Sequence, residues 1–262
     1  MIHYRILGPL EVEVDGASCT PTAPKNRQVL ALLLLNAGRV LPIESFIEEL
    51  WDANPPASAV TTTQTYMYQL RKILHGKGGS REPVLLTRAP GYLLRVQQGQ
   101  TDVESFDRIA AQGRAMLAAG EVERAAERLS QALNLWRGPA AMPDVSRGPL
   151  LQANLAALEE RRIRVLYERI EADLMLGRYA GLMAELRRLV AERPLDEWLH
   201  CRLMAALYGL GRRGEALTAY HQASQVLQEH LGLDPSAELR QMQRLVLAGR
   251  PLETAPARSL VS

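Results

Sequence analysis

Cysteine is scarce in this sequence, and so are long apolar segments. The only two cysteines, Cys19 and Cys201, lie in different halves of the 262 residues, which favours isolated thiols over a disulfide framework or a metal site. The longest apolar stretch, residues 29–35, is far shorter than the roughly 20 residues that a membrane helix needs. Residues 1–14 lack the charged and apolar segments of a signal peptide. We therefore expect a protein of the reducing cytoplasm, without a membrane partner.

Lysine is rare as well. Only three of the 31 basic residues are lysines, a bias that indicates a GC-rich genome. The net charge of +2 hides an uneven distribution: residues 53–99 hold six basic residues and one acidic residue, whereas residues 1–52 hold four and seven. Residues 100–262 hold 21 of each. Positive charge is thus concentrated in one segment, as expected of a protein that binds nucleic acid.

Catalytic signatures are also missing from the sequence. The glycine-rich residues 76–80 lack the order of a phosphate-binding loop, so we interpret them as a flexible link. No spacing typical of metal ligands or of a catalytic triad is found among the histidines, which are His3, His75, His200, His221 and His230. The sequence predicts a protein that is not an enzyme and that binds no cofactor and no metal.

Residues 1–98 mix strand and helix patterns. Two short alternating runs, residues 3–7 and 10–14, predict a β-hairpin. Gly38 is expected to end the first helix, because a left-handed residue costs least at glycine. Two further β runs within residues 83–96 flank a turn. Three helices are predicted between the hairpins, over residues 25–36, 42–51 and 58–74. This order predicts an α+β winged helix-turn-helix.

The third predicted helix has an unusual polar face. Its expected apolar positions are Val60, Met67, Leu70, Ile73 and Leu74. The other positions offer hydroxyls, amides, tyrosines and two cations. The run Thr61–Thr63 is not expected of a merely solvated helix, since β-branched residues are poor helix formers. Hydroxyls and cations suit phosphates and amides suit base edges, so we expect this helix to lie in a DNA groove.

From about residue 102 onward only amphipathic helical patterns remain. Gly177 and Gly211 lie in similar segments 34 residues apart, the length of a tetratricopeptide repeat, and Gly120 marks an earlier variant. We expect each glycine at a close turn between helices, where a side chain would clash. The following helices are predicted over residues 122–136, 182–190 and 215–231. Aromatic residues at helical spacing are expected in the cores, namely Trp136, Tyr167, Tyr179, Trp198, Tyr208 and Tyr220.

The predicted architecture is therefore an α+β N-terminal winged helix-turn-helix followed by an all-α tetratricopeptide-like helical repeat domain. The expected domains are residues 1–98 and residues 99–250, and residues 251–262 are expected to be a disordered tail.

Five short segments match a known family. They are Leu7-Gly8-Pro9-Leu10, Lys25-Asn26-Arg27-Gln28, Glu49-Leu50-Trp51, Gln64 to Lys72, and Thr87 to Tyr92. In this order, the chain resembles the Streptomyces antibiotic regulatory protein family, in which an OmpR-type effector domain precedes a bacterial transcriptional activation domain. The resemblance implies a transcription activator of an antibiotic or other secondary-metabolite gene cluster. It also implies partners: double-stranded promoter DNA with direct repeats, a second protomer on that DNA, and RNA polymerase with its sigma factor.

The resemblance also implies roles for single residues. Base-facing positions are Gln64, Thr65, Tyr68 and Gln69; glutamine can pair with adenine, and a threonine methyl can contact a thymine methyl. Positions for the DNA backbone are Thr61, Thr62, Arg71 and Lys72, and we add Lys25 and Arg27, at the start of the first helix. Arg88 is expected in the minor groove. The loop expected to face RNA polymerase comprises Asp52, Ala53, Asn54, Pro55 and Pro56. Gln69 replaces the arginine of response-regulator relatives, so their guanine contact is not carried over.

Two other functions fit the same residues. A protein-interaction scaffold would use the helical repeats and keep the winged helix as a structural module, and it would leave no DNA footprint. A repressor would make the same DNA contacts as an activator, and a transcription assay separates the two.

Overall fold

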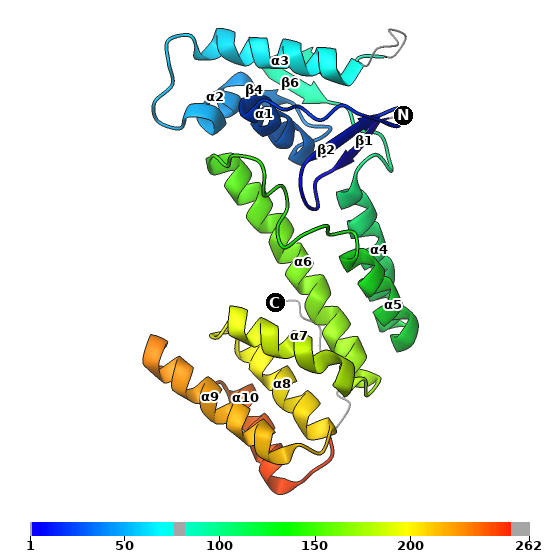
Figure 1. Cartoon of the computed structure of the whole chain (residues 1–262), viewed down its shortest axis with the longest axis vertical. Coiled ribbons are helices and arrows are strands. Elements are labelled where there is room, and N and C mark those ends of the chain that lie inside the picture. Colours follow the sequence, from blue (N-terminus) through cyan, green and yellow to red (C-terminus); the bar gives the residue numbers. More distant parts are fainter. Residues whose placement is uncertain (1, 76–81, 253–262) are drawn as a thin grey trace. The chain divides into compact units, whose positions relative to one another are not determined.

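The computed structural model describes residues 2–75 and 82–252 (Figure 1). The chain divides into two compact units, which are described one at a time. The first unit consists of residues 1–112 and 128–166, and the second consists of residues 113–127 and 167–262.

Two expected features lie outside the described residues. The flexible link expected at residues 76–80, which contains Lys77, is one of them, and the neighbouring Arg81 lies outside the described residues as well. The tail expected over residues 251–262 is the other, from residue 253 onward.

The first unit begins with a small antiparallel sheet. Strand β1 (Ile2–Arg5) pairs with β2 (Glu11–Val14), and β2 pairs with β3 (Ala17–Ser18). Alternate residues of β1 and β2 are buried, as the alternating sequence predicts for strands with one face on a core. The predicted hairpin is confirmed. The third strand escaped prediction because two residues show no periodicity.

The three predicted helices are confirmed, and a second sheet packs with them. The helices are α1 (Pro24–Leu35), α2 (Ile43–Trp51) and α3 (Ala59–His75). The strands are β4 (Leu41–Pro42), β5 (Leu85–Arg88) and β6 (Gly91–Leu94), in the order β4-β6-β5. In Figure 1, α1 and α2 lie beneath α3. The two-residue strand β4 was not predicted, and it extends the predicted hairpin into a three-stranded wing sheet.

The first unit continues past the winged helix. The Asp102 carboxylate accepts hydrogen bonds from the backbone N–H groups of Ile6 (2.9 Å) and Leu7 (3.0 Å). The N–H of Arg137 donates to the carbonyl of Leu7 at 2.7 Å. Asp144 accepts from the N–H of Leu10 at 3.0 Å. The compact unit therefore includes both sides of the predicted boundary between residues 98 and 99, and that boundary stays a prediction.

The rest of the described chain is helical, as predicted. The helices are α4 (Asp102–Ala118), α5 (Val122–Leu133), α6 (Pro149–Met175), α7 (Tyr179–Glu192), α8 (Glu197–Gly209), α9 (Arg213–Leu231) and α10 (Ala237–Ala248). In the second unit α7 packs on α8, α8 on α9, and α10 on both α8 and α9. None of the helices described has the length and apolarity to cross a membrane.

The repeat glycines lie at helix ends, but not for the expected reason. Gly120, Gly177 and Gly211 have φ angles of +79°, +67° and +74°. At each, the glycine N–H donates to the carbonyl three residues back and the next N–H donates five residues back, at 2.9–3.0 Å. A Cβ would meet nothing within 4 Å at Gly120 and Gly211. The left-handed backbone requires glycine here, and the expected side-chain clash is absent.

Two of the six aromatic residues expected in the cores are buried, and the other four, Tyr167, Tyr179, Trp198 and Tyr208, are half-buried. Trp136 is 7% exposed and packs edge to face on Phe106, with ring centroids 5.8 Å apart. Tyr220 is also buried. Trp198 is only half-buried and stacks on Tyr167, with centroids 4.0 Å apart. The core expectation is confirmed for Trp136 and Tyr220.

Alanine at a repeat turn should destabilise the second unit through backbone conformation alone. We expect Gly211→Ala to lower the free energy of unfolding by about 1 kcal/mol, the cost of a left-handed residue with a Cβ. Urea denaturation of the full chain, followed by circular dichroism, measures it.

Gly214 is the matched control. It lies in the first turn of α9, has no positive φ and has open space around a Cβ. Gly214→Ala should leave the stability unchanged or raised. Equal losses in the two variants would contradict the backbone explanation.

Candidate nucleic-acid interface

Helix α3 buries one face and exposes the other. The buried residues are Ala59, Thr63, Met67, Leu70 and Leu74. This stripe corrects two expectations. Val60 was expected inside but is 46% exposed, because it lies about 100° around the helix from the buried Ala59. Thr63 was expected to face out, but it is fully buried and its hydroxyl donates to the carbonyl of Ala59 at 2.9 Å.

The four predicted base-facing residues are all exposed. They are Gln64, Thr65, Tyr68 and Gln69, and Tyr68 is 68% exposed. Positions 61, 64, 65, 68 and 72 follow helical spacing, so their side chains share one face. The Thr65 hydroxyl donates to the carbonyl of Thr61 at 3.0 Å. The Gln69 Oε1 accepts a hydrogen bond from Asn26 Nδ2 at 2.8 Å. Contact of these residues with bases stays a prediction.

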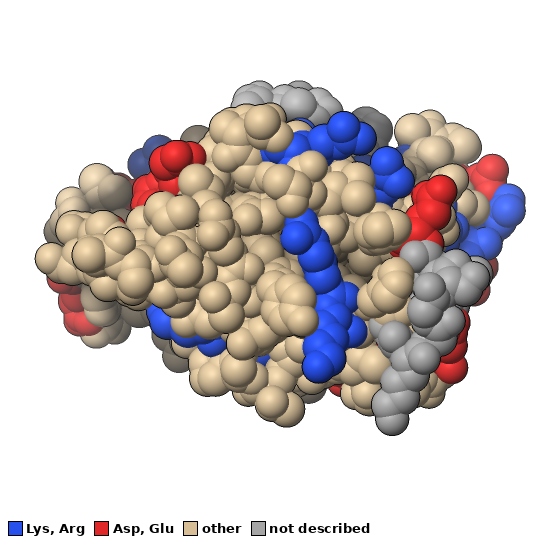
Figure 2. Space-filling view, turned by 90° about the horizontal axis from the view of Figure 1, so that it is seen from above, with Lys and Arg blue, Asp and Glu red and all other residues tan. Residues whose placement is uncertain are grey.

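The cations of α3 differ in their surroundings. Lys72 is exposed, and no hydrogen bond or ion pair of it is found among the described residues. Arg71 is half-buried: its Nε donates to the carbonyl of Leu85 at 3.0 Å and its Nη2 to Thr87 Oγ1 at 2.7 Å. Its guanidinium also lies 5.7 Å from the ring centroid of Tyr92. Arg71 thus ties α3 to the wing, and contact of Arg71 or Lys72 with a phosphate stays a prediction. Figure 2 shows the face that carries α3, with a stripe of Lys and Arg across it.

Lys25 and Arg27 have protein partners where phosphate contacts were expected. Lys25 Nζ donates to the carbonyl of Leu50 at 2.7 Å. The guanidinium of Arg27, only 14% exposed, donates to the carbonyl of Pro21 and forms an ion pair with Asp144. The charge of Arg27 is thus paired within the protein, whereas Lys25 donates only to neutral oxygens; contact of either residue with DNA stays a prediction. Their partners lie up to 117 residues away in the sequence, so no local pattern reveals them.

The wing presents Arg88 and buries Tyr92. Arg88 pairs with Gly91 beside the turn at Ala89-Pro90, and its side chain is exposed. Tyr92 is 7% exposed and packs edge to face on Phe46, with centroids 6.1 Å apart. Tyr92 therefore anchors the hairpin. Insertion of Arg88 into a minor groove stays a prediction.

The loop between α2 and α3 is fully exposed over the residues predicted to face RNA polymerase, which are Asp52, Ala53, Asn54, Pro55 and Pro56. Asp52 has a φ of +51°, and its N–H donates to the carbonyl of Glu48 at 2.8 Å. The carbonyl of Pro56 accepts from the N–H of Ala59 at 2.9 Å. Both ends of the loop are thus held, and its side chains point to solvent.

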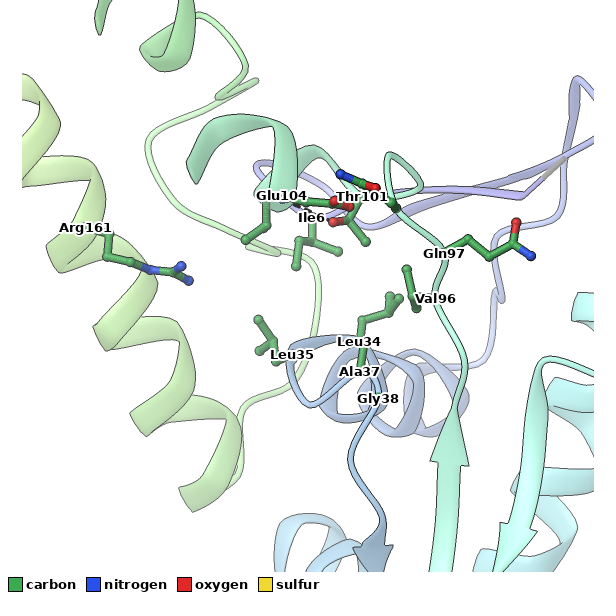
Figure 3. Close-up of a pocket in the computed structure, with 12 residues that line it drawn as sticks. Ile6, Leu34, Leu35, Ala37, Gly38, Val96, Gln97, Thr101, Glu104 and Arg161 are labelled. Carbon is green, nitrogen blue, oxygen red and sulfur yellow. Dashed lines mark hydrogen bonds between the residues drawn. The ribbon is translucent and has the colours of Figure 1, made fainter. Parts of the chain in front are cut away.

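A cavity of about 480 Å³ lies in the first unit (Figure 3). Its apolar lining includes Ile6, Leu34, Leu35, Val96 and Val103. Two charged side chains reach it, and each has a partner. The Arg161 guanidinium donates to the Asp107 carboxylate at 2.6 Å, and the Glu104 carboxylate accepts from the N–H of Gly99 at 2.7 Å. The cavity offers no unpaired acid or base among its described lining residues, and it does not have the make-up of an active site.

Comparison with known proteins identifies the family. Residues 18–94 match the family described as transcriptional regulatory protein, C terminal, and residues 101–247 match the bacterial transcriptional activator domain. The regulatory protein DnrI of Streptomyces peucetius is 43% identical over 255 residues, which cover 95% of this chain and 93% of DnrI. This chain belongs to the Streptomyces antibiotic regulatory protein family. Members of this family are transcription regulators, and so is this chain; it is not an enzyme.

Two further relatives support the assignment to this family. The transcriptional regulator RedD of Streptomyces coelicolor is 34% identical over 258 residues, covering 98% of this chain and 73% of RedD. A solved structure of Mycobacterium tuberculosis EmbR, in complex with a low affinity phosphopeptide, has a TM-score of 0.89 at 33% identity. That comparison covers 97% of this chain and 66% of the EmbR chain. The predicted winged helix followed by a helical domain is thereby confirmed.

Removal of the charge at Lys72 should affect DNA binding, whereas removal of the charge at Arg27 should affect stability. Lys72→Ala should weaken binding to all DNA sequences and reduce the slope of log K against log salt by about 0.9, the value for one phosphate contact. Arg27→Ala should leave that slope unchanged, because its charge is already paired, and should lower stability by about 2 kcal/mol. Fluorescence anisotropy at several salt concentrations and urea denaturation measure the two effects.

Arg108→Ala is the control, since Arg108 is an exposed cation on α4, away from α3 and the wing in sequence. It should change neither quantity. If the salt dependence of DNA binding became weaker in Arg27→Ala and stayed the same in Lys72→Ala, the phosphate contact would belong to Arg27 and not to Lys72.

Proposed function

We propose that this chain activates a secondary-metabolite gene cluster by binding direct repeats in its promoters. Helix α3 would lie in a major groove and Arg88 in the adjacent minor groove. The observation that carries the proposal is the exposed polar face of α3, which ends beside the basic wing in Lys72, a cation without an ion pair among the described residues. The described fold leaves this face exposed, and its groups are those that phosphates and base edges require.

The proposal extends to the partners. Two protomers would bind side by side, one per repeat, because a single winged helix reads only a few base pairs. The exposed loop of residues 52–56 would contact RNA polymerase or its sigma factor, since its fixed ends and two prolines hold it in one conformation. The place of action would be the nucleoid, in the cytoplasm. The relatives DnrI and RedD are named as regulators of Streptomyces, which supports the same role here.

Repeat spacing tests the DNA-binding mode. A footprint on the promoters that flank the gene should reveal two repeats. Adding about 10 base pairs, a full helical turn, between them should retain joint occupancy, and adding about 5 should reduce it, since the second protomer would then face the opposite side of the duplex. Equal binding at every spacing would contradict paired protomers, and no footprint at all would favour the scaffold function.

Transcription in vitro tests the polymerase contact. The double variant Asn54→Ala with Pro55→Ala should bind the promoter as tightly as the unaltered chain, yet lower transcript yield about fivefold, the loss expected from one good interface contact. Glu44→Ala, an exposed change in α2, is the control and should alter neither. If the unaltered chain lowers transcription, the protein is a repressor.

A further inference from the structure

A buried amide lies beneath one of the exposed residues of α3. Asn26, in α1, is 5% exposed, and its Nδ2 donates to the Oε1 of Gln69 at 2.8 Å. Gln69 itself is exposed, but the residue after it, Leu70, is fully buried and fixes the helix against the core. The end of the Gln69 side chain is therefore held from below by an amide that cannot move freely.

In the Gln69 amide, the oxygen has a hydrogen-bond partner within the protein and the NH2 group has none among the described residues. The oxygen accepts from Asn26, and no partner of the Nε2 group is found among the described residues. A glutamine that pairs with adenine uses both halves, because its oxygen accepts from N6 while its nitrogen donates to N7. Here the oxygen is turned toward the buried Asn26, which takes one of its two lone pairs, so the planar amide presents its two N–H groups outward.

The major-groove edges of the bases differ in what they offer a donor. Guanine presents two neighbouring acceptors, N7 and O6, and no donor. Adenine and cytosine each present an amino group, which would face the Gln69 N–H groups unfavourably, and thymine presents one acceptor beside a methyl group. We propose that Asn26 is a positioning residue that makes Gln69 a hydrogen-bond donor and thereby directs it to guanine. This inference rests on the proposed function, in which α3 enters the major groove.

The bond to Asn26 also has an energetic consequence. A long exposed side chain normally loses rotamer freedom when it binds, at a cost of roughly 0.5–1.5 kcal/mol. Because Gln69 is already held in the free protein, part of that ordering precedes binding. The positioning residue therefore acts on both the choice of base and the strength of the contact.

Selection of binding sites from a randomised DNA library tests the inference. The full chain should select guanine at one position of each repeat. In Asn26→Asp the new carboxylate has no donor, so it accepts from Gln69 Nε2 and turns Oε1 outward; that position should then select cytosine or adenine. The ratio of affinities for guanine and cytosine there should fall about tenfold. Selection at pH 8 keeps the carboxylate ionised.

Two more variants keep the test decisive if Asn26→Asp does not fold. Gln69→Glu retains the bond from Asn26 and presents an oxygen to DNA, so it should produce the same change of base. Asn26→Ala frees Gln69 and should relax the position to guanine and adenine together. Gln64→Glu is the matched control, because it adds the same charge on the same face and should leave this position unchanged.

The outcomes separate the inference from the proposed function. If the unaltered chain selects a sequence and the Asn26 and Gln69 variants select the same base at every position, the inference is overturned and DNA binding stands. If the unaltered chain selects no sequence, the proposed function fails and this inference fails with it. A change of base in Gln64→Glu at the same position would assign the contact to Gln64 and also overturn the inference.

Discussion

One buried carboxylate joins three helices of the first unit. Glu49, in α2, is 2% exposed, and its two oxygens accept from the N–H groups of Gly148 (2.6 Å) and Leu151 (2.9 Å) at the start of α6. Gln28, in α1, donates to the same carboxylate at 2.9 Å and to the Glu49 carbonyl at 2.8 Å. The first N–H groups of a helix have no partner within it and favour negative charge. Without the Glu49 carboxylate, each donor left buried without an acceptor would lower the free energy of unfolding by about 1–3 kcal/mol. Gly148 is required as well, because a Cβ there would lie 2.2 Å from the Glu49 carbonyl oxygen.

Two of the segments that resemble the family make hydrogen bonds that hold the first unit together. All four residues of Lys25-Asn26-Arg27-Gln28 make hydrogen bonds away from α1, to Leu50, Gln69, Asp144 and Glu49 respectively. In Leu7-Gly8-Pro9-Leu10, the carbonyls of Leu7, Gly8 and Pro9 accept bonds from Arg137 and Met142. The winged helix is thus held to the segment after residue 98 by its most characteristic residues. A charged residue in such a segment can therefore have a partner within the fold, as the ion pair of Arg27 with Asp144 shows.

Sequence patterns predicted the parts of the fold that depend on interactions between residues close together in the sequence. The hairpins, the helices and the glycine positions follow from periodicity and from backbone preference, and all were found. Periodicity cannot reveal strands of two residues, such as Leu41–Pro42, whose existence depends on pairing with Gly91 and Tyr92. It also placed Val60 on the wrong face, because the buried stripe starts one residue earlier, at Ala59. The hydrogen-bond partners of Lys25 and Arg27 could not be predicted from periodicity either, because these bonds join residues that are far apart in the sequence.

The same reasoning narrows where DNA specificity can lie. Of the polar residues on α3, Thr63 is buried, Arg71 is bonded to the wing, and the hydroxyl of Thr65 is bonded to its own helix. Each of these groups serves the fold first, and its freedom to adapt to a base is correspondingly small. Gln64 and Tyr68 are exposed and have no hydrogen bond among the described residues, and the Gln69 oxygen is turned toward Asn26. If α3 enters the major groove as proposed, the base sequence that the protein reads would be set mainly by these few side chains, and a buried residue such as Asn26 would help to decide which of their atoms face the DNA.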